Sequence, residues 1–238
     1  GVASPWSAPP SKWRLATAII VTTLALASCS AHGPRPNGST SVNAPKPAAE
    51  GLAHDLEAVR RNPDSAFARA NLGVEYGRLG RWDEAIVELK TAPRLDPTDS
   101  EAFDELAFAQ WKIDRLDEAL TSADEAIRLD PRSSTAYITK GLVLEDLGRT
   151  EDARTSFEEA IQLDPENDDA WYNLAWLLWS YGPAQDAVSP ARQATRVNAD
   201  CGLCYGLLSA ILYDAEDFEE PLRAGREAVR LDPTDDQP

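Results

Sequence analysis

The sequence has few of the residues that enzymes and metal sites use most. Its 238 residues include two histidines, His32 and His54, and neither lies in a metal-binding or nucleophilic spacing. It also lacks a glycine-rich phosphate loop and the G-x-S-x-G and H-E-x-x-H motifs. Acidic pairs such as Asp168-Asp169 lie at predicted helix starts, where they complement the helix dipole. The sequence therefore predicts no catalytic residue, no cofactor, no metal and no small-molecule substrate.

Basic residues are also scarce. The chain has 23 Lys and Arg against 40 Asp and Glu, which gives a net charge of −17. The acid excess lies in residues 50–238, because residues 1–49 contain no Asp or Glu. Binding to DNA or RNA requires Lys and Arg that displace counterions from the phosphates. Nucleic acid is therefore not an expected partner, and the acidic surface is expected to serve solubility.

An apolar run lies near the N-terminus, directly after two basic residues. Lys12 and Arg14 precede the 13 apolar and small residues 15–27. This run is shorter than the roughly 20 residues that span a bilayer, but it has the length of a signal-peptide core. A cleaved signal peptide is the favoured interpretation. An uncleaved anchor and a simple secretory signal with a chance cysteine are the alternatives.

The run ends in the letters L-A-S-C, with the cysteine at position 29. This ending resembles the lipobox of bacterial lipoproteins, which implies a signal peptide at residues 1–28 and a lipid-carrying Cys29. Several acyl chains on one cysteine would anchor the protein stably to a membrane. The resemblance implies a location in the cell envelope, and Ser30 favours the periplasmic face of the outer membrane if the cell is Gram-negative. Residues 29–49, rich in Pro, Gly, Ser, Asn and Ala, are expected to form a flexible tether.

The rest of the chain repeats every 34 residues. The letters R-L-D-P or Q-L-D-P end at Pro97, Pro131, Pro165 and Pro233, and the weaker R-V-N-A ends at Ala199. Apolar residues inside each unit recur at helical spacing, and Gly-Arg turn signals separate two halves. Each unit is therefore predicted to be a pair of antiparallel helices. Small residues at fixed positions of the unit are expected where the two helices cross.

This pattern resembles the tetratricopeptide repeat (TPR) family, which implies an all-α solenoid of antiparallel helix pairs. The register places five repeats at residues 66–99, 100–133, 134–167, 168–201 and 202–235, after a capping half repeat at 50–65. Three prolines depart from the pattern. We expect Pro190 to kink or break its helix and Pro93 to shorten the last turn of its helix, whereas Pro221 is tolerated in a first turn.

The resemblance also implies a partner-binding site. In this family the first helix of each repeat lines a concave groove, and eight large side chains occupy the groove positions here: Phe108, Trp111, Leu142, Tyr172, Asn173, Trp176, Trp179 and Tyr213. We expect a protein or peptide partner to bind the aromatic anchors, with Trp179 exposed and Asn173 bonded to the partner's backbone. The alternative is that these side chains pack between repeats.

Cys201 and Cys204 lie at the junction of the fourth and fifth repeats. Outside the cytoplasm a disulfide persists, and three-residue spacing in a helical turn puts the two Cα atoms roughly 5–6 Å apart, within disulfide range. Such a bridge would contribute about 2 kcal/mol to stability in the chain-entropy model. Reduced thiols and a redox or metal site are the alternatives, although no further cysteine or histidine lies near enough in sequence to complete a zinc site.

Together these features predict a membrane-anchored, non-enzymatic adaptor in the bacterial cell envelope that binds protein partners of unknown identity. A promiscuous chaperone-like holder would use the same groove. A thiol oxidoreductase that uses Cys201 and Cys204 is the third hypothesis.

Overall fold

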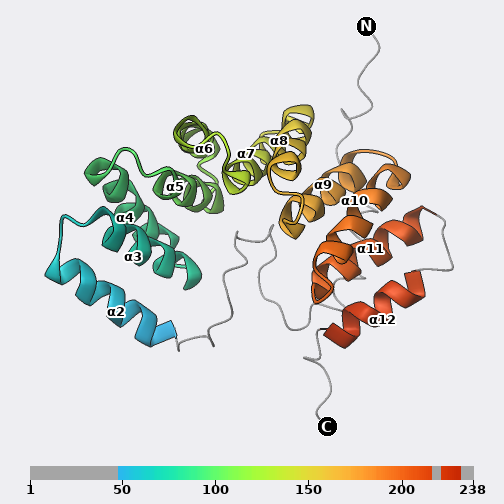
Figure 1. Ribbon diagram of the computed structural model, residues 1–238, viewed down its shortest axis with the longest axis horizontal. Coiled ribbons are helices and arrows are strands. Elements are labelled where there is room, and N and C mark those ends of the chain that lie inside the picture. The colour runs from blue at the N-terminus through green and yellow to red at the C-terminus, as the bar shows by residue number, and fades with distance from the viewer. Residues whose placement is uncertain (1–47, 216–220, 232–238) are drawn as a thin grey trace, which may run out of the picture. The chain divides into compact units, whose positions relative to one another are not determined.

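The computed structural model describes residues 48–215 and 221–231, and every regular element in these ranges is an α-helix (Figure 1). The helices are α2 (Ala48–Arg61), α3 (Ala66–Arg78), α4 (Trp82–Leu95), α5 (Ser100–Lys112), α6 (Leu116–Leu129), α7 (Ser134–Asp146), α8 (Thr150–Leu163), α9 (Asp168–Tyr181), α10 (Ala184–Val197), α11 (Gly202–Asp214) and α12 (Pro221–Leu231). The all-α fold class is confirmed. The proposed signal peptide, Cys29 and the tether up to residue 47 lie outside the described residues.

The helices form two compact units. Helices α2 to α7 belong to the first unit and α8 to α12 to the second, with the boundary between Gly148 and Arg149. In each unit every helix packs against the next one along the chain. The first helices of successive repeats also touch, α3 against α5 and α5 against α7 in the first unit, and α9 against α11 in the second. This is the contact pattern of stacked helix pairs.

The first helix of each pair begins at a fixed point of the 34-residue period. Helices α3, α5, α7, α9 and α11 begin at residues 66, 100, 134, 168 and 202. The residue before each of them caps the helix, because its side chain accepts a hydrogen bond from the backbone N–H three residues on: Ser65, Asp99, Ser133, Asn167 and Cys201. Such caps satisfy N–H groups that have no partner inside the helix. Cys201 is the one cap among these five whose acceptor atom is sulfur.

Small residues lie where the two helices of a pair meet. Ala85, Ala119 and Ala126 are fully buried. A Cβ placed on Gly73 of α3 would lie 2.5 Å from Leu89 Cγ of α4, far inside the normal contact distance. The backbones of α3 and α4 therefore approach more closely than a larger side chain would allow.

The helix break expected at Pro190 and the shortened last turn expected at Pro93 do not occur. Helix α10 runs from Ala184 to Val197 without interruption through Pro190. Helix α4 keeps 14 residues despite Pro93, the same length as α6. Both proline rings are buried, so tertiary packing on the neighbouring helices offsets the loss of one backbone hydrogen bond. Helix α12 begins at Pro221, a position where the missing N–H has no cost.

Candidate functional site

Three of the predicted groove residues belong to the interior of the first unit. Phe108 and Trp111 of α5 are 8% and 9% exposed, and Leu142 of α7 is 2% exposed. Phe108 packs on Trp111 with ring centroids 5.4 Å apart and on Trp82 of α4 at 6.0 Å. These side chains therefore pack between helices, as in the alternative interpretation of the aromatic set.

Trp179 of α9 is also buried, so the expectation that it is exposed is wrong. It is 2% exposed, its indole Nε1 donates a hydrogen bond to Asp214 Oδ2 at 2.9 Å, and its ring lies 5.8 Å from that of Trp176. Its position faces the first helix of the next repeat, where Asp214 ends α11. The N–H of a buried tryptophan needs an acceptor, and this carboxylate supplies it.

The same tryptophan–aspartate contact occurs once in each unit. Trp111 Nε1 donates to Asp146 Oδ2 between α5 and α7, as Trp179 donates to Asp214 between α9 and α11, and both pairs are 35 residues apart. Each contact joins the first helices of successive repeats. In the sequence the pairing corresponds only to a 68-residue recurrence of the two tryptophans and the two aspartates, which is twice the repeat period.

A smaller set of the predicted residues lies at the surface of the second unit. Tyr213 of α11 is 58% exposed, and Tyr172 and Trp176 of α9 are half-buried. We call these three side chains, together with Asn173 of α9, the α9–α11 aromatic face. Trp176 is linked to the end of α11 through the interior, because it packs on Trp179, which donates a hydrogen bond to Asp214, the residue after Tyr213.

Asn173 in this face is a buried amide with an unsatisfied donor. It is 2% exposed, and its Nδ2 has no acceptor among the described residues. A buried N–H group without a partner costs free energy, which is recovered when an acceptor arrives. The structure therefore places Asn173 in the interior of the second unit, with a donor that no described residue satisfies.

The first unit carries an acidic stretch on α5 that the sequence motifs did not single out. Burial raises the pKa of Glu105 to about 7, and the negative charges of Asp104 and Glu101 also act to raise this pKa. Burial also raises the pKa of Asp104, although the neighbouring hydroxyl groups of Thr139 and Thr135 act to lower it. This unit also exposes Phe67 of α3, whose side chain is 74% exposed.

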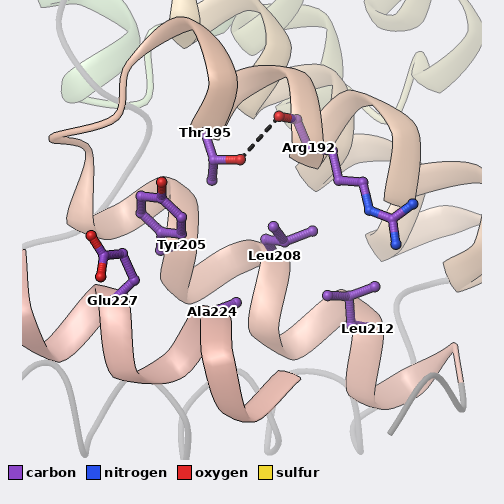
Figure 2. A pocket seen from close by; sticks show the side chains of 7 residues that line it. All are labelled: Arg192, Thr195, Tyr205, Leu208, Leu212, Ala224 and Glu227. Carbon is purple, nitrogen blue, oxygen red and sulfur yellow. Dashed lines mark hydrogen bonds between the residues drawn. The ribbon is translucent and has the colours of Figure 1, made fainter. Parts of the chain in front are cut away.

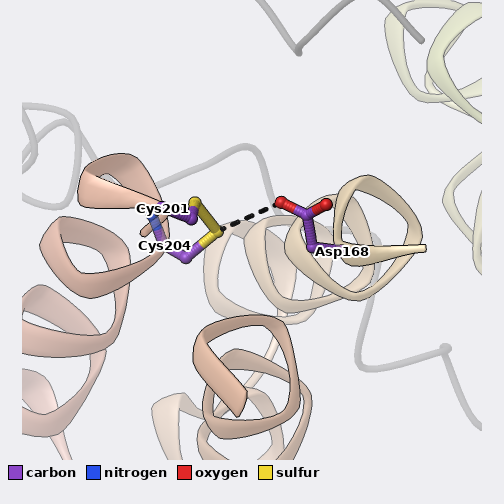
Figure 3. A group of neighbouring side chains, drawn as sticks. All are labelled: Asp168, Cys201 and Cys204. Atoms are coloured by element: carbon purple, nitrogen blue, oxygen red, sulfur yellow. Dashed lines mark hydrogen bonds between the residues drawn. A yellow bond between two sulfur atoms is a disulfide. The ribbon is translucent and has the colours of Figure 1, made fainter. Parts of the chain in front are cut away.

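The two cysteines form a disulfide at the N-terminus of α11 (Figure 3). The Cα atoms of Cys201 and Cys204 are 5.3 Å apart, and both residues are 1% exposed. They pack against Trp171, Tyr172 and Leu203. Thiol–disulfide exchange with a protein substrate needs an accessible sulfur atom. The burial of both cysteines therefore disfavours the hypothesis that this pair is a thiol oxidoreductase.

Asp168 at the start of α9 lies beside the disulfide. Its Oδ2 is 3.9 Å from Cys204 Sγ and accepts a hydrogen bond of 3.0 Å from Asn198 Nδ2. This neighbour was missed from the sequence, since Asp168 precedes Cys204 by 36 residues. The expectation that ligands for a metal are lacking rested on cysteine and histidine alone, and it left out this carboxylate.

A pocket of about 480 Å³ lies between α10, α11 and α12 of the second unit (Figure 2). Leu208, Leu212 and Ala224 form its apolar part, and Arg192 and Glu227 lie at its edge. The pocket is separate from the disulfide and from the residues predicted for the groove.

Comparison with known proteins identifies the repeat. Residues 105–154 match the family described as tetratricopeptide repeat, and residues 141–182 match the one described as TPR repeat. These matches support the TPR family. No curated protein sequence matches the chain. No helix in the described part of the chain combines the length and apolar character that crossing a bilayer requires.

Solved structures share the TPR-type solenoid fold. YrrB, described as a TPR protein with an unusual peptide-binding site, has a TM-score of 0.53 at 17% identity, over 77% of this chain and 94% of YrrB. TTC0263, a thermophilic TPR protein from Thermus thermophilus, has a TM-score of 0.63 at 21% identity, over 72% of this chain and 93% of its own. A chain of the APC/C hetero-tetramer Cut9-Hcn1 has a TM-score of 0.69 at 16% identity, over 79% of this chain and 37% of its own. At these identities the likeness shows the fold alone.

Proposed function

We propose that this chain is a non-enzymatic adaptor that binds a segment of a partner protein on the α9–α11 aromatic face. The observation that carries the proposal is the pair of partly exposed aromatic side chains, Trp176 and Tyr213, on the touching helices α9 and α11, where α9 also holds the unsatisfied Asn173 Nδ2. Aromatic residues bury a large area at a small cost in side-chain entropy, and a buried amide fixes the direction of a bound backbone. TPR-type folds are generally scaffolds for protein–protein interaction, and the description of YrrB names a peptide-binding site.

Within this face, Trp176 and Tyr213 supply the contact area for a partner. Both lie on first helices of their repeats, α9 and α11, and these two helices touch. An extended segment laid across the two helices would cover both aromatic rings. Its carbonyl group would bond to Asn173, on the same helix as Trp176, once the side chains that bury this amide move aside.

The experiment begins with peptides selected from a displayed random library against the folded chain. We expect Trp176→Ala and Tyr213→Ala each to weaken binding of a selected peptide at least about tenfold, because each removes a large anchor. Isothermal titration calorimetry measures the affinity. Val87→Ala is the matched control, since Val87 is 63% exposed but lies on a second helix, α4.

Wild-type affinity in both aromatic variants, with unchanged circular dichroism and thermal unfolding, would contradict this site. Similar affinity for many unrelated peptides would favour the promiscuous holder over the adaptor. Both outcomes leave the fold and the family unaffected.

We also propose that the adaptor acts in the cell envelope, anchored to a bacterial membrane through a lipid on Cys29. The support is the basic region, the apolar run and the L-A-S-C ending of the sequence. In a bacterial host, the wild-type chain is expected in the membrane fraction, and Cys29→Ser is expected to lose the acyl chains in mass spectrometry. An unmodified Cys29 in membrane-bound wild type would contradict the lipid anchor.

A further inference from the structure

Three donor atoms of the kinds that bind thiophilic metal ions meet at the N-terminus of α11 (Figure 3). They are Cys201 Sγ, Cys204 Sγ and a carboxylate oxygen of Asp168, and all lie within 4.8 Å of one another. The two sulfurs come from one helical turn, whereas Asp168 comes from the start of α9. The stacking of one repeat on the next therefore assembles a set of ligands that no single segment contains.

The distances suit one tetrahedral ion. Zinc–sulfur bonds of about 2.3 Å and zinc–oxygen bonds of about 2.1 Å place two ligand atoms about 3.6–3.8 Å apart. Asp168 Oδ2 is already 3.9 Å from Cys204 Sγ. The sulfurs are bonded in this structure, so they must separate before an ion can enter. A rotation of the Cys201 and Cys204 side chains, with the backbone held in place, provides that separation.

The surroundings favour the ionised ligands. Cys201 occupies the N-cap of α11, and its sulfur accepts a 2.9 Å hydrogen bond from the backbone N–H of Cys204. Helix N-termini stabilise thiolates, which are the metal-binding form of cysteine. Asn198 Nδ2 donates to Asp168 Oδ2 and holds the carboxylate in place, as outer-shell groups do around metal ligands.

We propose that reduction of the Cys201–Cys204 disulfide converts this cluster into a binding site for a thiophilic divalent cation, with Zn²⁺ the best fit. A small-molecule dithiol reductant, which needs less access to the sulfurs than a protein substrate does, transfers two electrons and two protons to the disulfide and is itself oxidised to a disulfide. The ion then binds both sulfurs and the Asp168 carboxylate, and the two thiol protons pass to water. Two sulfur ligands disfavour Ca²⁺ and Mg²⁺, which take oxygen ligands. Three protein ligands leave the fourth position to water.

The test uses the full chain with Cys29→Ser, so that Cys201 and Cys204 are the only thiols. Thiol counting is expected to find none before reduction and two after it. Co²⁺ is then added to the reduced chain as a spectroscopic probe for Zn²⁺. One equivalent is expected to produce the near-ultraviolet sulfur-to-cobalt absorption, which Zn²⁺ then removes, whereas the oxidised chain should give no signal.

Two carboxylate variants distinguish the proposed site from adventitious binding to a thiol pair. Asp168→Asn removes one ligand and is expected to weaken Co²⁺ binding by about 10–100-fold, the range seen when groups around a metal site are lost. Asp200→Asn removes the same charge beside Cys201 from a side chain that is exposed, and it should leave the affinity unchanged.

Three results would overturn the proposal. One is a folded, reduced chain that gives no sulfur-to-cobalt absorption. Another is equal affinity in the Asp168→Asn and Asp200→Asn variants. The third is a loss of helical circular dichroism on reduction, since the site depends on an intact α11 N-terminus.

Discussion

Trp179→Ala is expected to lower the free energy of unfolding by about 3–5 kcal/mol, the range for removing a buried aromatic side chain. Trp179 is 2% exposed and is among the largest fully buried side chains of the protein. The change removes its contact with Trp176 and leaves Asp214 without the indole donor. It acts on the contact between α9 and α11, and stacked repeats depend on such nearest-neighbour contacts. Urea unfolding followed by far-ultraviolet circular dichroism measures the loss.

Trp179→Phe separates the contribution of the buried ring from that of the hydrogen bond to Asp214. Phenylalanine keeps much of the buried area but has no donor for Asp214, so we expect a loss of about 1.5–3 kcal/mol, the value of a hydrogen bond to a charged group. A cost below about 1 kcal/mol for Trp179→Ala would show that the side chain does not support the repeat contact. Val87→Ala, at an exposed site, should change stability by no more than about 0.5 kcal/mol.

Glu105→Gln is expected to stabilise the protein at pH 8 by about 2–3 kcal/mol and to have little effect at pH 4. Burial raises the pKa of Glu105 from 4.5 to about 7, so the folded state holds this proton more tightly than the unfolded state does. Stability from this group is therefore fully present below pH 4.5 and is lost as the pH rises to 7. A tenfold change in the proton-binding constant corresponds to about 1.36 kcal/mol, and glutamine removes the penalty because it never ionises.

Urea unfolding of the wild type and of Glu105→Gln between about pH 4 and pH 8 tests this dependence. Glu166→Gln is the matched control, because Glu166 is exposed, lies outside α5 and is not one of the charges that raise the pKa of Glu105. The control is expected to change stability by about 0.5 kcal/mol or less over the same range. A constant difference between Glu105→Gln and the wild type at all pH values would exclude a raised pKa as the cause.

Local patterns in the sequence were sufficient to predict the helices. The recurrence of apolar residues at helical spacing and of L-D-P endings places each first helix, and capping residues such as Ser133 and Asn167 fall one position before the start. These are short-range properties, because a cap and the N–H group that it satisfies lie within one turn. The prediction of a helix break at Pro190 was wrong, because the stability of α10 depends on contacts outside the helix. The packing that keeps α10 intact comes from neighbouring helices.

The candidate site was predicted only in part. The first helices of three repeats carry an aromatic side chain on the same face: Phe108, Trp176 and Tyr213. Helical periodicity alone therefore predicts the same exposure to solvent for all three. The next repeat decides which of them is covered, and Tyr213 is 58% exposed whereas Phe108 is 8% exposed. The acceptor for Trp179 and the third neighbour of the cysteines were also missed, because they lie 35 and 36 residues away in the chain.

The sequence by itself determined that this chain is a series of helix pairs with a 34-residue period, since helix formation, capping and close helix crossing depend on residues a few positions apart. The stacking of repeats decided the rest. It buried Trp111 and Trp179 against Asp146 and Asp214, and it brought Asp168 beside Cys201 and Cys204. The physical reason is that burial and the meeting of donor atoms depend on which surfaces of successive repeats face each other, and the repeat period does not specify those surfaces.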